Sequence, residues 1–207
     1  MAATLDHLLW GGPDLGIAID TLEQLTGVRA VPGGQHPDTG THNALAAIGP
    51  KAFLEVIAPD ATLKAGALAG RLHALAAPTL LMWAAATKSA AETAARATAE
   101  GYQTAVVEGH RSRPDGQIVR WTNVFVSGHG AGTLVPFFIE WATPSHPADD
   151  APTGLRLKTL HAETPQPAAL RAVLEALDVK LKVRKADVAR LVAVLDTPNG
   201  PVTLMSG

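Results

Sequence analysis

The chain of 207 residues contains no cysteine, which excludes disulfide bonds, thiolate zinc sites and a cysteine nucleophile. Aromatic residues are also few, at 4% against 47% hydrophobic residues that are largely alanine, so we expect close helix–sheet contacts lined by alanine. Charge of neither sign dominates, because 17 basic and 19 acidic residues give a formal net charge of −2. The chain therefore has no general attraction to nucleic acid or to an anionic membrane.

Long apolar runs and leader-like features are missing as well. No uncharged apolar stretch reaches about 18 residues, so no segment is expected to span a membrane. The N-terminal segment MAATLDHLLW has neither a basic region nor a long apolar run, and it does not read as a signal peptide. A Gly-rich phosphate loop and a Gly-x-Ser-x-Gly elbow are absent too. We therefore expect a cytoplasmic protein whose partner is a small molecule rather than nucleic acid or membrane.

What the chain does contain is a pair of similar segments. Residues 5–27 (LDHLLWGGPDLGIAIDTLEQLTG) and 79–101 (TLLMWAAATKSAAETAARATAEG) each show an apolar strand ending in Trp, a turn, an amphipathic helix and a Gly. Each is followed by more strands and by a related phrase, FLEVIAP after the first and FIEWATP after the second. Equivalent strands that carry one carboxylate each, Glu55 and Glu140, can direct both into one pocket by pseudo-twofold symmetry.

Apolar periodicity and turn residues predict the order β-α-β-β-β three times. In the first copy we expect a strand at 5–10, a helix at 15–26 and strands at 28–31, 44–48 and 53–58. In the second we expect a strand at 79–86, a helix at 88–100 and strands near 103–109, 117–126 and 134–142. A third, shorter copy has a strand at 155–160, a helix at 167–177 and three short strands. We place the modules at residues 1–60, 61–147 and 148–207.

Proline, glycine and aspartate mark the expected loops. Pro32-Gly33-Gly34 is expected to stop the strand at 28–31, with a polar loop at 35–40 after it. The segment RSRPDG at 111–116 predicts a turn between strands. The segment SHPADDAPTG at 145–154 predicts an exposed linker, in which His146 is exposed.

Taken in order, five phrases resemble the glyoxalase-like domain group of the vicinal oxygen chelate superfamily: LDHLLW, GGQHPDTGTHNAL, FLEVIAPD, RPDG and VPFFIEW. The resemblance covers most of residues 5–147. It implies an α+β fold of tandem βαβββ modules that form a curled mixed sheet, a cup around a divalent metal (Zn, Fe, Mn, Ni or Mg). Members include lyases, isomerases, dioxygenases, epimerases and metal-free drug-binding proteins, so the fold does not name the reaction.

The resemblance also implies metal ligands. Carried over position by position, they are His7 in the first strand, Glu55 in the last strand of the first module and Glu140 in the last strand of the second. The fourth position falls on Leu80, which cannot bind a metal. Three ligands still allow a His-plus-carboxylate set with open positions. The other possibility is that the metal is lost and the cup binds its ligand without one.

Strand alternation gives a test of this arrangement. His7 shares a face with Leu9, and Glu55 shares a face with Ile57, so both can face the cup. A buried carboxylate is costly without a partner, so Glu55 needs a metal, a cation or a donor. A buried His7–Glu55 hydrogen-bonded pair without an ion also satisfies this requirement.

His42 and Asn43 begin the strand that pairs with the Glu55 strand. A three-residue turn at 49–51 pairs Leu45 with Glu55 and puts Asn43 on the cup face, whereas a two-residue turn brings His42 there. Either residue is a candidate catalytic acid, base or additional ligand. The alternative is that both hydrogen-bond the backbone of the loop around residues 33–40. His36 and Asp38, in that loop, lie at the mouth if it folds over the pocket and in solvent if it does not.

The candidate substrate-binding residues are a guanidinium and two indoles. Arg111, Arg113 and Arg120 form a group from which Arg113 is the candidate anion clamp, with a solvated turn as the alternative. Trp83 and Trp141 are expected to line an apolar cup with Phe137.

The sequence thus favours a metal-dependent enzyme of lyase, isomerase or dioxygenase type acting on a small oxygenated metabolite. The alternative is a metal-free protein that binds or sequesters a small molecule, as in drug resistance. The third module must bury its apolar residues against the first two or against a second chain, and we expect a homodimer.

Overall fold

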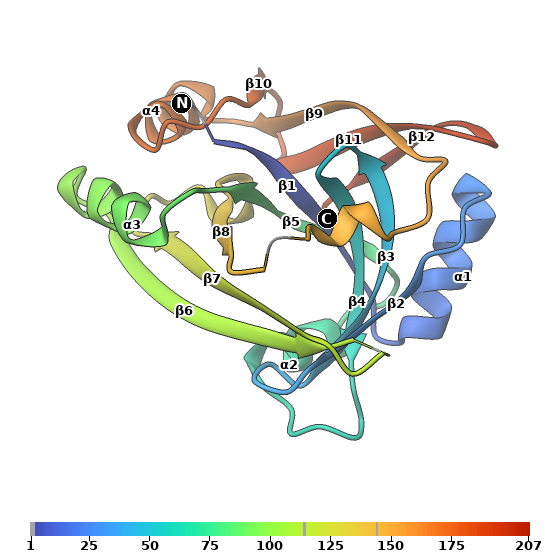
Figure 1. Ribbon diagram of the computed structural model, residues 1–207. Helices are drawn as coiled ribbons and strands as arrows, with labels where there is room; N and C mark the ends of the chain where they lie inside the picture. The colour runs from blue at the N-terminus through green and yellow to red at the C-terminus, as the bar shows by residue number, and fades with distance from the viewer. Residues whose placement is uncertain (1–2, 114, 144) are drawn as a thin grey trace.

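A computed structural model describes residues 3–113, 115–143 and 145–207 of the chain. Eight strands close into a barrel and four more form a separate sheet. Figure 1 shows this sheet and helix α4 lying across one side of the barrel, with α1 and α3 at its two ends. The predicted α+β class and the threefold β-α-β-β-β order are confirmed. None of the helices in the described part of the chain is long and apolar enough to cross a membrane.

The three copies have the following bounds. The first comprises β1 (Thr4–Gly11), α1 (Leu15–Thr26), β2 (Val31–His36), β3 (Thr41–Gly49) and β4 (Ala52–Pro59). After α2 (Ala67–His73), the second comprises β5 (Thr79–Ala86), α3 (Ala90–Ala99), β6 (Gln103–Ser112), β7 (Ile118–Ser127), the short 3-10 helix η1 (Gly132–Leu134) and β8 (Phe137–Trp141). After the 3-10 helix η2 (Pro147–Asp149), the third comprises β9 (Arg156–Thr164), α4 (Pro167–Ala176), β10 (Lys182–Lys185), β11 (Arg190–Thr197) and β12 (Gly200–Met205).

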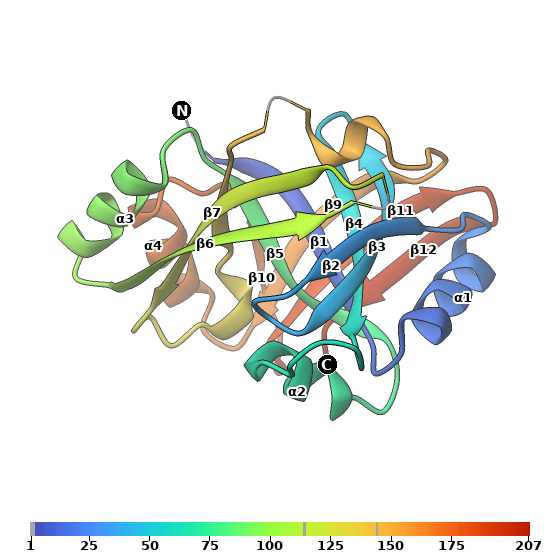
Figure 2. The ribbon, with the colours of Figure 1, turned by 60° about the horizontal axis from the view of Figure 1, so that its bottom comes forward.

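The barrel is a mixed sheet in which the two modules meet along two pairs of strands. Its strand order is β1-β4-β3-β2-β6-β7-β8-β5. The first and last strands of each module are parallel, β1 with β4 and β5 with β8. The modules join through antiparallel pairing of β1 with β5 and of β2 with β6, and Figure 2 shows the long β6–β7 hairpin beside β2 and β3. The predicted curled cup is therefore a closed barrel made of two modules.

Helix α1 illustrates how local sequence sets the outer layer. The Asp14 carboxylate accepts a hydrogen bond from the Ile17 backbone N–H at 2.8 Å, which caps the first turn. Gly27 ends the helix with a φ of 75°, a conformation that favours glycine. Between them, Ile19 and Leu22 are buried at helical spacing against the outside of the barrel.

The C-terminal module packs on its own chain. Leu170, Leu174 and Leu191 belong to the same buried cluster as Leu8 and Trp83 of the barrel. Of the two predicted ways to bury this module, the structure shows the one against the first two modules. The homodimer stays a prediction, as do the module boundaries.

Two expected loops are ordered elements. Pro32-Gly33-Gly34 lies inside β2, and the strand expected at 28–31 is wrong. Beyond Pro32 the pairing with β3 shifts by one residue, which accommodates a proline that lacks an N–H. The turn at 111–116 begins later than expected, because Arg111 and Ser112 end β6. Pro114 of that turn lies outside the described residues.

The expected linker at 145–154 is packed against the barrel. Ala148 and Ala151 are buried with Leu45 and Phe53, and the Ala47 N–H donates to the Pro152 carbonyl at 2.8 Å. His146 is also largely covered. The prediction of an exposed linker is wrong because small apolar residues between the Pro and Asp residues bury a complementary surface.

Candidate functional site

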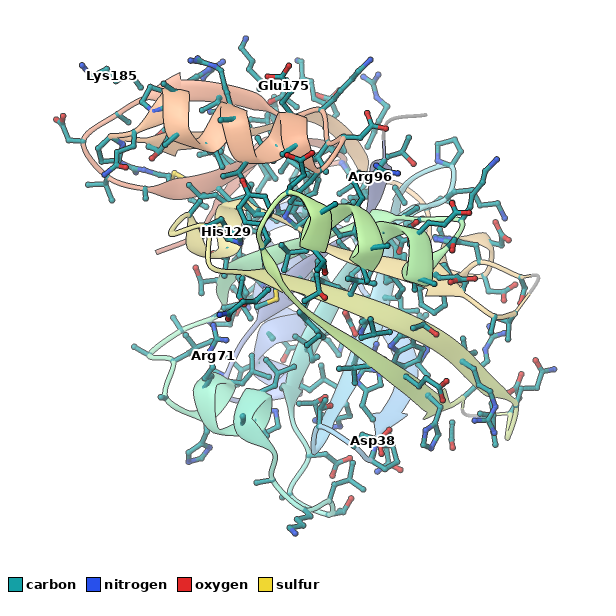
Figure 3. The ribbon with its side chains drawn as sticks, turned by 90° about the vertical axis from the view of Figure 1, so that its left-hand side faces the viewer. Asp38, Arg71, Arg96, His129, Glu175 and Lys185 are labelled. Atoms are coloured by element: carbon teal, nitrogen blue, oxygen red, sulfur yellow. The ribbon has the colours of Figure 1, made fainter. Side chains whose placement is uncertain are left out.

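The barrel encloses a cavity of about 170 Å³ that receives side chains from all eight strands. A cavity of about 150 Å³ accommodates a molecule of the size of benzene, so this one suits a small ligand. Among its lining residues Asp38, Val107, Glu108 and Phe125 are exposed, and the Asp38 carboxylate lies 3.3 Å from His110 Nδ1. Figure 3 shows Asp38 at the end of the molecule opposite Glu175 and Lys185 of the C-terminal module. The part of the rim at Asp38 therefore lies away from that module.

The two halves of the barrel contribute different chemistry to the lining. The first module supplies His7, His36, Asn43 and Glu55. The second supplies apolar and aromatic groups from Met82, Trp121, Phe125, Phe137, Ile139 and Trp141, together with the polar or charged side chains of Glu108, His110, Arg111 and Asn123. Polar groups therefore come from both modules, and the first module supplies the His7–Glu55 pair.

His7 is held by a buried carboxylate behind it. Its Nδ1 lies 2.7 Å from Asp6 Oδ1, and its ring stacks on Phe53 with centroids 4.7 Å apart. Trp141 Nε1 donates to Asp6 Oδ2 at 2.9 Å, and His146 Nε2 lies 3.2 Å from the same oxygen. Because His146 Nδ1 accepts the Ala148 N–H, its Nε2 is the donor to Asp6.

Three donors therefore converge on Asp6, which is 1% exposed. Burial opposes its ionisation, but the hydrogen bonds from His146 and His7 outweigh burial and hold the pKa of Asp6 well below its usual range. An ionised Asp6 accepts the Nδ1–H of His7, so His7 Nε2 is left free to face the cavity.

Glu55 faces that free nitrogen. Its Oε2 lies 3.5 Å from His7 Nε2, and its Oε1 accepts a hydrogen bond from Asn43 Nδ2 at 2.6 Å. Leu45 pairs with Glu55 across β3 and β4, which is the register of a three-residue turn. The structure therefore places Asn43, and not His42, on the cavity wall.

His36 is the second imidazole of this wall. Its Nδ1 lies 3.0 Å from Thr41 Oγ1, and its Nε2 lies 3.9 Å from Glu55 Oε1. Burial lowers the pKa of His36, the Glu55 carboxylate opposes this, and the Arg111 cation adds to it. His36 is therefore kept neutral more strongly than a histidine in water.

The donors on this wall do not fit the divalent metal that the resemblance implies. The resemblance places the second module's ligands on β5 and β8, whose inward positions hold Met82 and Ile139, and these offer no nitrogen or oxygen ligand. One oxygen of Glu55 already accepts the Asn43 amide, and the Arg111 cation nearby disfavours a second cation. No group of three His, Cys, Asp or Glu side chains in residues 3–113, 115–143 and 145–207 is placed to hold an ion.

Glu140 does not join His7 and Glu55, so the expected convergence of three ligands is wrong. The inward residues of β8 are Phe137, Ile139 and Trp141. Glu140 points outward and accepts the backbone N–H of Ala90 at 2.7 Å, in the first turn of α3. A carboxylate is favourable there because the helix N-terminus carries free N–H groups and a positive dipole end.

Three other candidates also lie outside the cavity. His42 faces out from β3, 3.8 Å from Asp60. Trp83 packs on the outer side of β5, where its Nε1 donates to the Leu134 carbonyl at 3.1 Å. Arg113 pairs with Asp150 at 2.6 Å, outside the barrel. The neighbouring inward positions of β3 and β5 hold Asn43 and Met82. Arg113 follows the end of β6, and the arginine that lines the cavity is Arg111 of that strand.

Sequence reasoning missed several members of the site. Arg111 was set aside in favour of Arg113, and Asp6 lies on the outward parity of β1. A register shift between Leu5 and His7 lets the Asp6 carboxylate reach the His7 ring. His36 gave a usable signal, since it stands seven residues before Asn43 in the same phrase.

Comparisons with known proteins identify the family and the fold. The glyoxalase-like domain family matches residues 5–177 of this chain. No curated protein matches the chain at a significant level. A hypothetical protein from Staphylococcus aureus has a similar structure, with a TM-score of 0.64 and 13% identity over 97% of this chain and 84% of that one.

Two enzymes are also similar in structure. The methylmalonyl-CoA epimerase from Mycobacterium tuberculosis gives a TM-score of 0.51 at 22% identity, over 69% of this chain and 90% of that one. A mutant of 4-hydroxymandelate synthase from Streptomyces coelicolor gives 0.54 at 16% identity, over 99% of this chain and 62% of that one. Likeness at these identities shows the fold alone.

Proposed function

Since this chain belongs to the glyoxalase-like domain family of the vicinal oxygen chelate superfamily, we propose that it is an enzyme that moves a proton on a small oxygenated substrate in the barrel cavity. The observation that supports this most is the pair formed by His7 and Glu55. The free imidazole nitrogen and a carboxylate oxygen face each other at 3.5 Å, inside a cavity, with Asp6 behind the imidazole.

His7 acts as the base. Asp6 keeps the proton of the neutral ring on Nδ1 and aims Nε2 into the cavity, which is the role of a carboxylate behind a catalytic histidine. His7 Nε2 takes a proton from a carbon next to a carbonyl. The C–H bond breaks and its electron pair moves toward the carbonyl oxygen. Asp6 stabilises the imidazolium that results.

Glu55 completes the proton transfer. Its Oε2 faces the protonated Nε2 of His7, and it can pass the proton to a second position on the substrate. Asn43 holds the other carboxylate oxygen at 2.6 Å and so fixes the orientation of Glu55. Removal and return of a proton are the steps of isomerisation, epimerisation and elimination, and this set of residues performs them without a metal.

The test is deuterium exchange in D2O, measured by NMR on 2-oxobutanoate and 2-butanone. We expect the protein to accelerate exchange at the carbon next to the ketone. His7→Gln and Glu55→Gln should each lower the rate by about 10²- to 10⁴-fold, the usual contribution of a positioned acid or base. His42→Gln, which changes an imidazole outside the cavity, is the matched control and should retain the full rate.

Whether the proposed mechanism needs a metal ion is tested separately. Elemental analysis should give much less than one metal ion per chain, and exchange should be unaffected by EDTA. Stoichiometric metal, with exchange lost on chelation and restored by the ion, would contradict the metal-free mechanism. An unchanged exchange rate in both His7→Gln and Glu55→Gln would contradict the proposed enzymatic function.

A second candidate function is supported by the apolar wall of the second module. Met82, Phe125, Phe137 and Ile139 suit a protein that only sequesters a small apolar molecule. That function predicts ligand binding with no exchange above the buffer rate for any carbonyl compound.

A further inference from the structure

More than half of the aromatic residues in this chain line one cavity. The sequence holds only four tryptophans, four phenylalanines and one tyrosine. Five of these side chains line the barrel cavity: Phe53, Trp121, Phe125, Phe137 and Trp141. The core elsewhere is built largely from aliphatic residues and alanine. This concentration therefore indicates a cavity suited to a ligand that aromatic rings bind.

Four of the five rings stand as two pairs across β7 and β8. Trp121 is opposite Trp141 in the register of these strands, and their ring centroids lie 5.6 Å apart. Phe125 and Phe137 stack further along the same two strands, with centroids 5.3 Å apart. Both pairs face the cavity.

The spacing of the two pairs leaves room for one more ring. Trp121 and Phe125 are four residues apart on β7, which corresponds to about 13 Å along a strand. A ring that lies between two others at centroid distances of about 4.5–7 Å needs about 9–14 Å in all. The inward positions midway hold Asn123 and Ile139, which are opposite each other. The space above them, between the two aromatic pairs, is the aryl slot.

The rings that border the aryl slot are accessible to a ligand. Phe125 is 40% exposed, and Trp121, Phe137 and Trp141 are partly exposed. All four line a cavity of about 170 Å³, whereas a cavity of about 150 Å³ already holds benzene. Covering this aromatic surface with an apolar ligand is favourable, because it removes the surface from water.

The aryl slot leads to the reactive pair. Phe137 also meets the His7 ring edge-on, with centroids 5.5 Å apart. A ligand ring beside Phe137 therefore directs its substituent toward His7, the base of the proposed mechanism. The Arg111 cation already interacts with the Glu55 carboxylate, so the cavity does not require a charged ligand.

We propose that the cavity binds a small uncharged aryl ketone, with its ring in the aryl slot and its carbonyl side chain directed toward His7. This assignment rests on the proposed function in taking His7 as the base, and it adds the substrate class. An aliphatic ketone is also favoured by burial, but it offers no ring quadrupole to the aromatic side chains around it.

The test is equilibrium binding, followed by calorimetry and by the fluorescence of Trp121 and Trp141. The probes are phenylacetone, cyclohexylacetone and phenylacetate. The two ketones share one carbon skeleton, and cyclohexylacetone is the more apolar, so a cavity that selects only by hydrophobicity binds it more tightly. We expect phenylacetone to bind about fivefold more tightly than cyclohexylacetone, and phenylacetate to bind more weakly than phenylacetone.

Variants assign the preference to its residues. Phe125→Leu should reduce the preference for phenylacetone to less than about twofold, and its fold should be retained because Phe125 is 40% exposed. Trp121→Leu should have the same effect from the other side of the aryl slot. Ile118→Leu is the matched control, since Ile118 lies on β7 outside the cavity and is 48% exposed, and it should keep the native preference.

Four results would overturn the proposal: equal or tighter binding of cyclohexylacetone, tightest binding of phenylacetate, a native preference in both Phe125→Leu and Trp121→Leu, or no binding of phenylacetone below about 10 mM. The outcome is independent of catalysis. A native chain that prefers phenylacetone but shows no deuterium exchange would refute the enzyme and leave the aryl slot standing. A native chain that exchanges 2-butanone without preferring the aryl probe would do the reverse.

Discussion

At the scale of single residues, the direction of one side chain decides which chemistry the barrel can perform. Glu140 and Glu55 occupy similar phrases in the sequence, yet one faces α3 and the other faces the cavity. A carboxylate at the start of a helix stabilises that helix, whereas the carboxylate beside the imidazole transfers a proton in the mechanism we propose. The two roles predict different consequences for the same substitution.

Glu140→Gln is therefore expected to lower the free energy of unfolding by about 0.5–1 kcal/mol, since it removes a charge from the N-terminus of α3. Urea unfolding followed by circular dichroism measures this change. Deuterium exchange should be unaltered. If Glu140→Gln instead lost deuterium exchange at unchanged stability, Glu140 would have to be counted among the residues of the functional site.

A second residue-scale prediction concerns acid. The lowered pKa of His36 means that the unfolded chain binds a proton first as the pH falls, so stability is full above about 6.5 and is lost as the pH falls through the lowered pKa. The charged or titratable groups that act on His36 are Glu55, Arg111 and His7 on the cavity side and His42 on the outer side of β3. One such group changes the unfolding free energy by at most about 1.4 kcal/mol per pH unit.

His36→Asn is the variant that isolates this effect, because its amide can still bond Thr41. Unfolding free energies between pH 8 and pH 5 should fall less steeply for the variant than for the native chain. The lowered pKa of Asp6 acts in a separate window, since its contribution is lost only as the pH falls below about 3.8. Parallel curves for the two proteins between pH 8 and pH 5 would contradict the assignment.

The sequence predicted the direction of two side chains that line the cavity. His7 and Glu55 came from the resemblance to the glyoxalase-like group, and alternation along β1 and β4 allowed both to face the cup, as they do. In β8 the phrase PFFIEW is apolar on both faces, so alternation could not tell whether Glu140 points in or out. Arg111 was missed because β6 continues through Arg111 and Ser112, the first two residues of the segment that the sequence assigned to a turn.

At the scale of elements, β2 shows how a breaker sequence can serve a strand. Gly33 has no side chain, and this lets the strand pass close to Arg111 and Asn43. The sequence rule that Pro-Gly-Gly ends a strand was overridden because pairing with β3 continues past the bulge. The rule could not take account of Asn43 and Arg111, the side chains on neighbouring strands that fill the space beside Gly33.

Gly33→Ala should accordingly disturb the site without changing its charge. The added methyl would meet both side chains well inside contact distance, and overpacking of this kind costs about 1–3 kcal/mol. We expect lower stability and slower deuterium exchange, because Asn43, which orients Glu55, must shift. Gly70→Ala is the matched control, because nothing lies within 4 Å of its added Cβ and alanine favours the α2 helix. Native stability and native exchange in Gly33→Ala would contradict the role given to Gly33.

At the scale of the whole molecule, the C-terminal module and the barrel share one core. Leu191 and Leu195 of β11 are fully buried in the cluster that contains Leu8 and Trp83. The sequence predicted this module and its apolar faces, but it could not say which surface covers them. A shared core implies that the two parts unfold together.

Leu191→Ala tests that implication. The cavity it leaves should lower the free energy of unfolding by about 2–5 kcal/mol. Because the core is shared, tryptophan fluorescence from the barrel and circular dichroism from all three modules should report one transition at the same urea concentration. Val188→Ala, at a position that is 56% exposed, should stay within about 0.5 kcal/mol of the native chain. Two separate transitions would show that the module is independent.

One argument for the expected homodimer no longer applies, because the C-terminal module needs no second chain to bury its apolar residues. Light scattering at micromolar concentration decides the matter, and a dimer mass would fulfil the prediction.

The unequal contribution of the two modules to the cavity wall has a consequence for how such a protein can change. One half of the barrel holds the reactive groups, while the other half mostly shapes the space in which the ligand tail lies. Replacing Met82 or Ile139 with larger or smaller side chains should therefore retune ligand choice while the proton-transfer apparatus on the far wall is left intact. A lineage, or a designer, can explore new ligands with this scaffold by editing one half of it and inheriting the other.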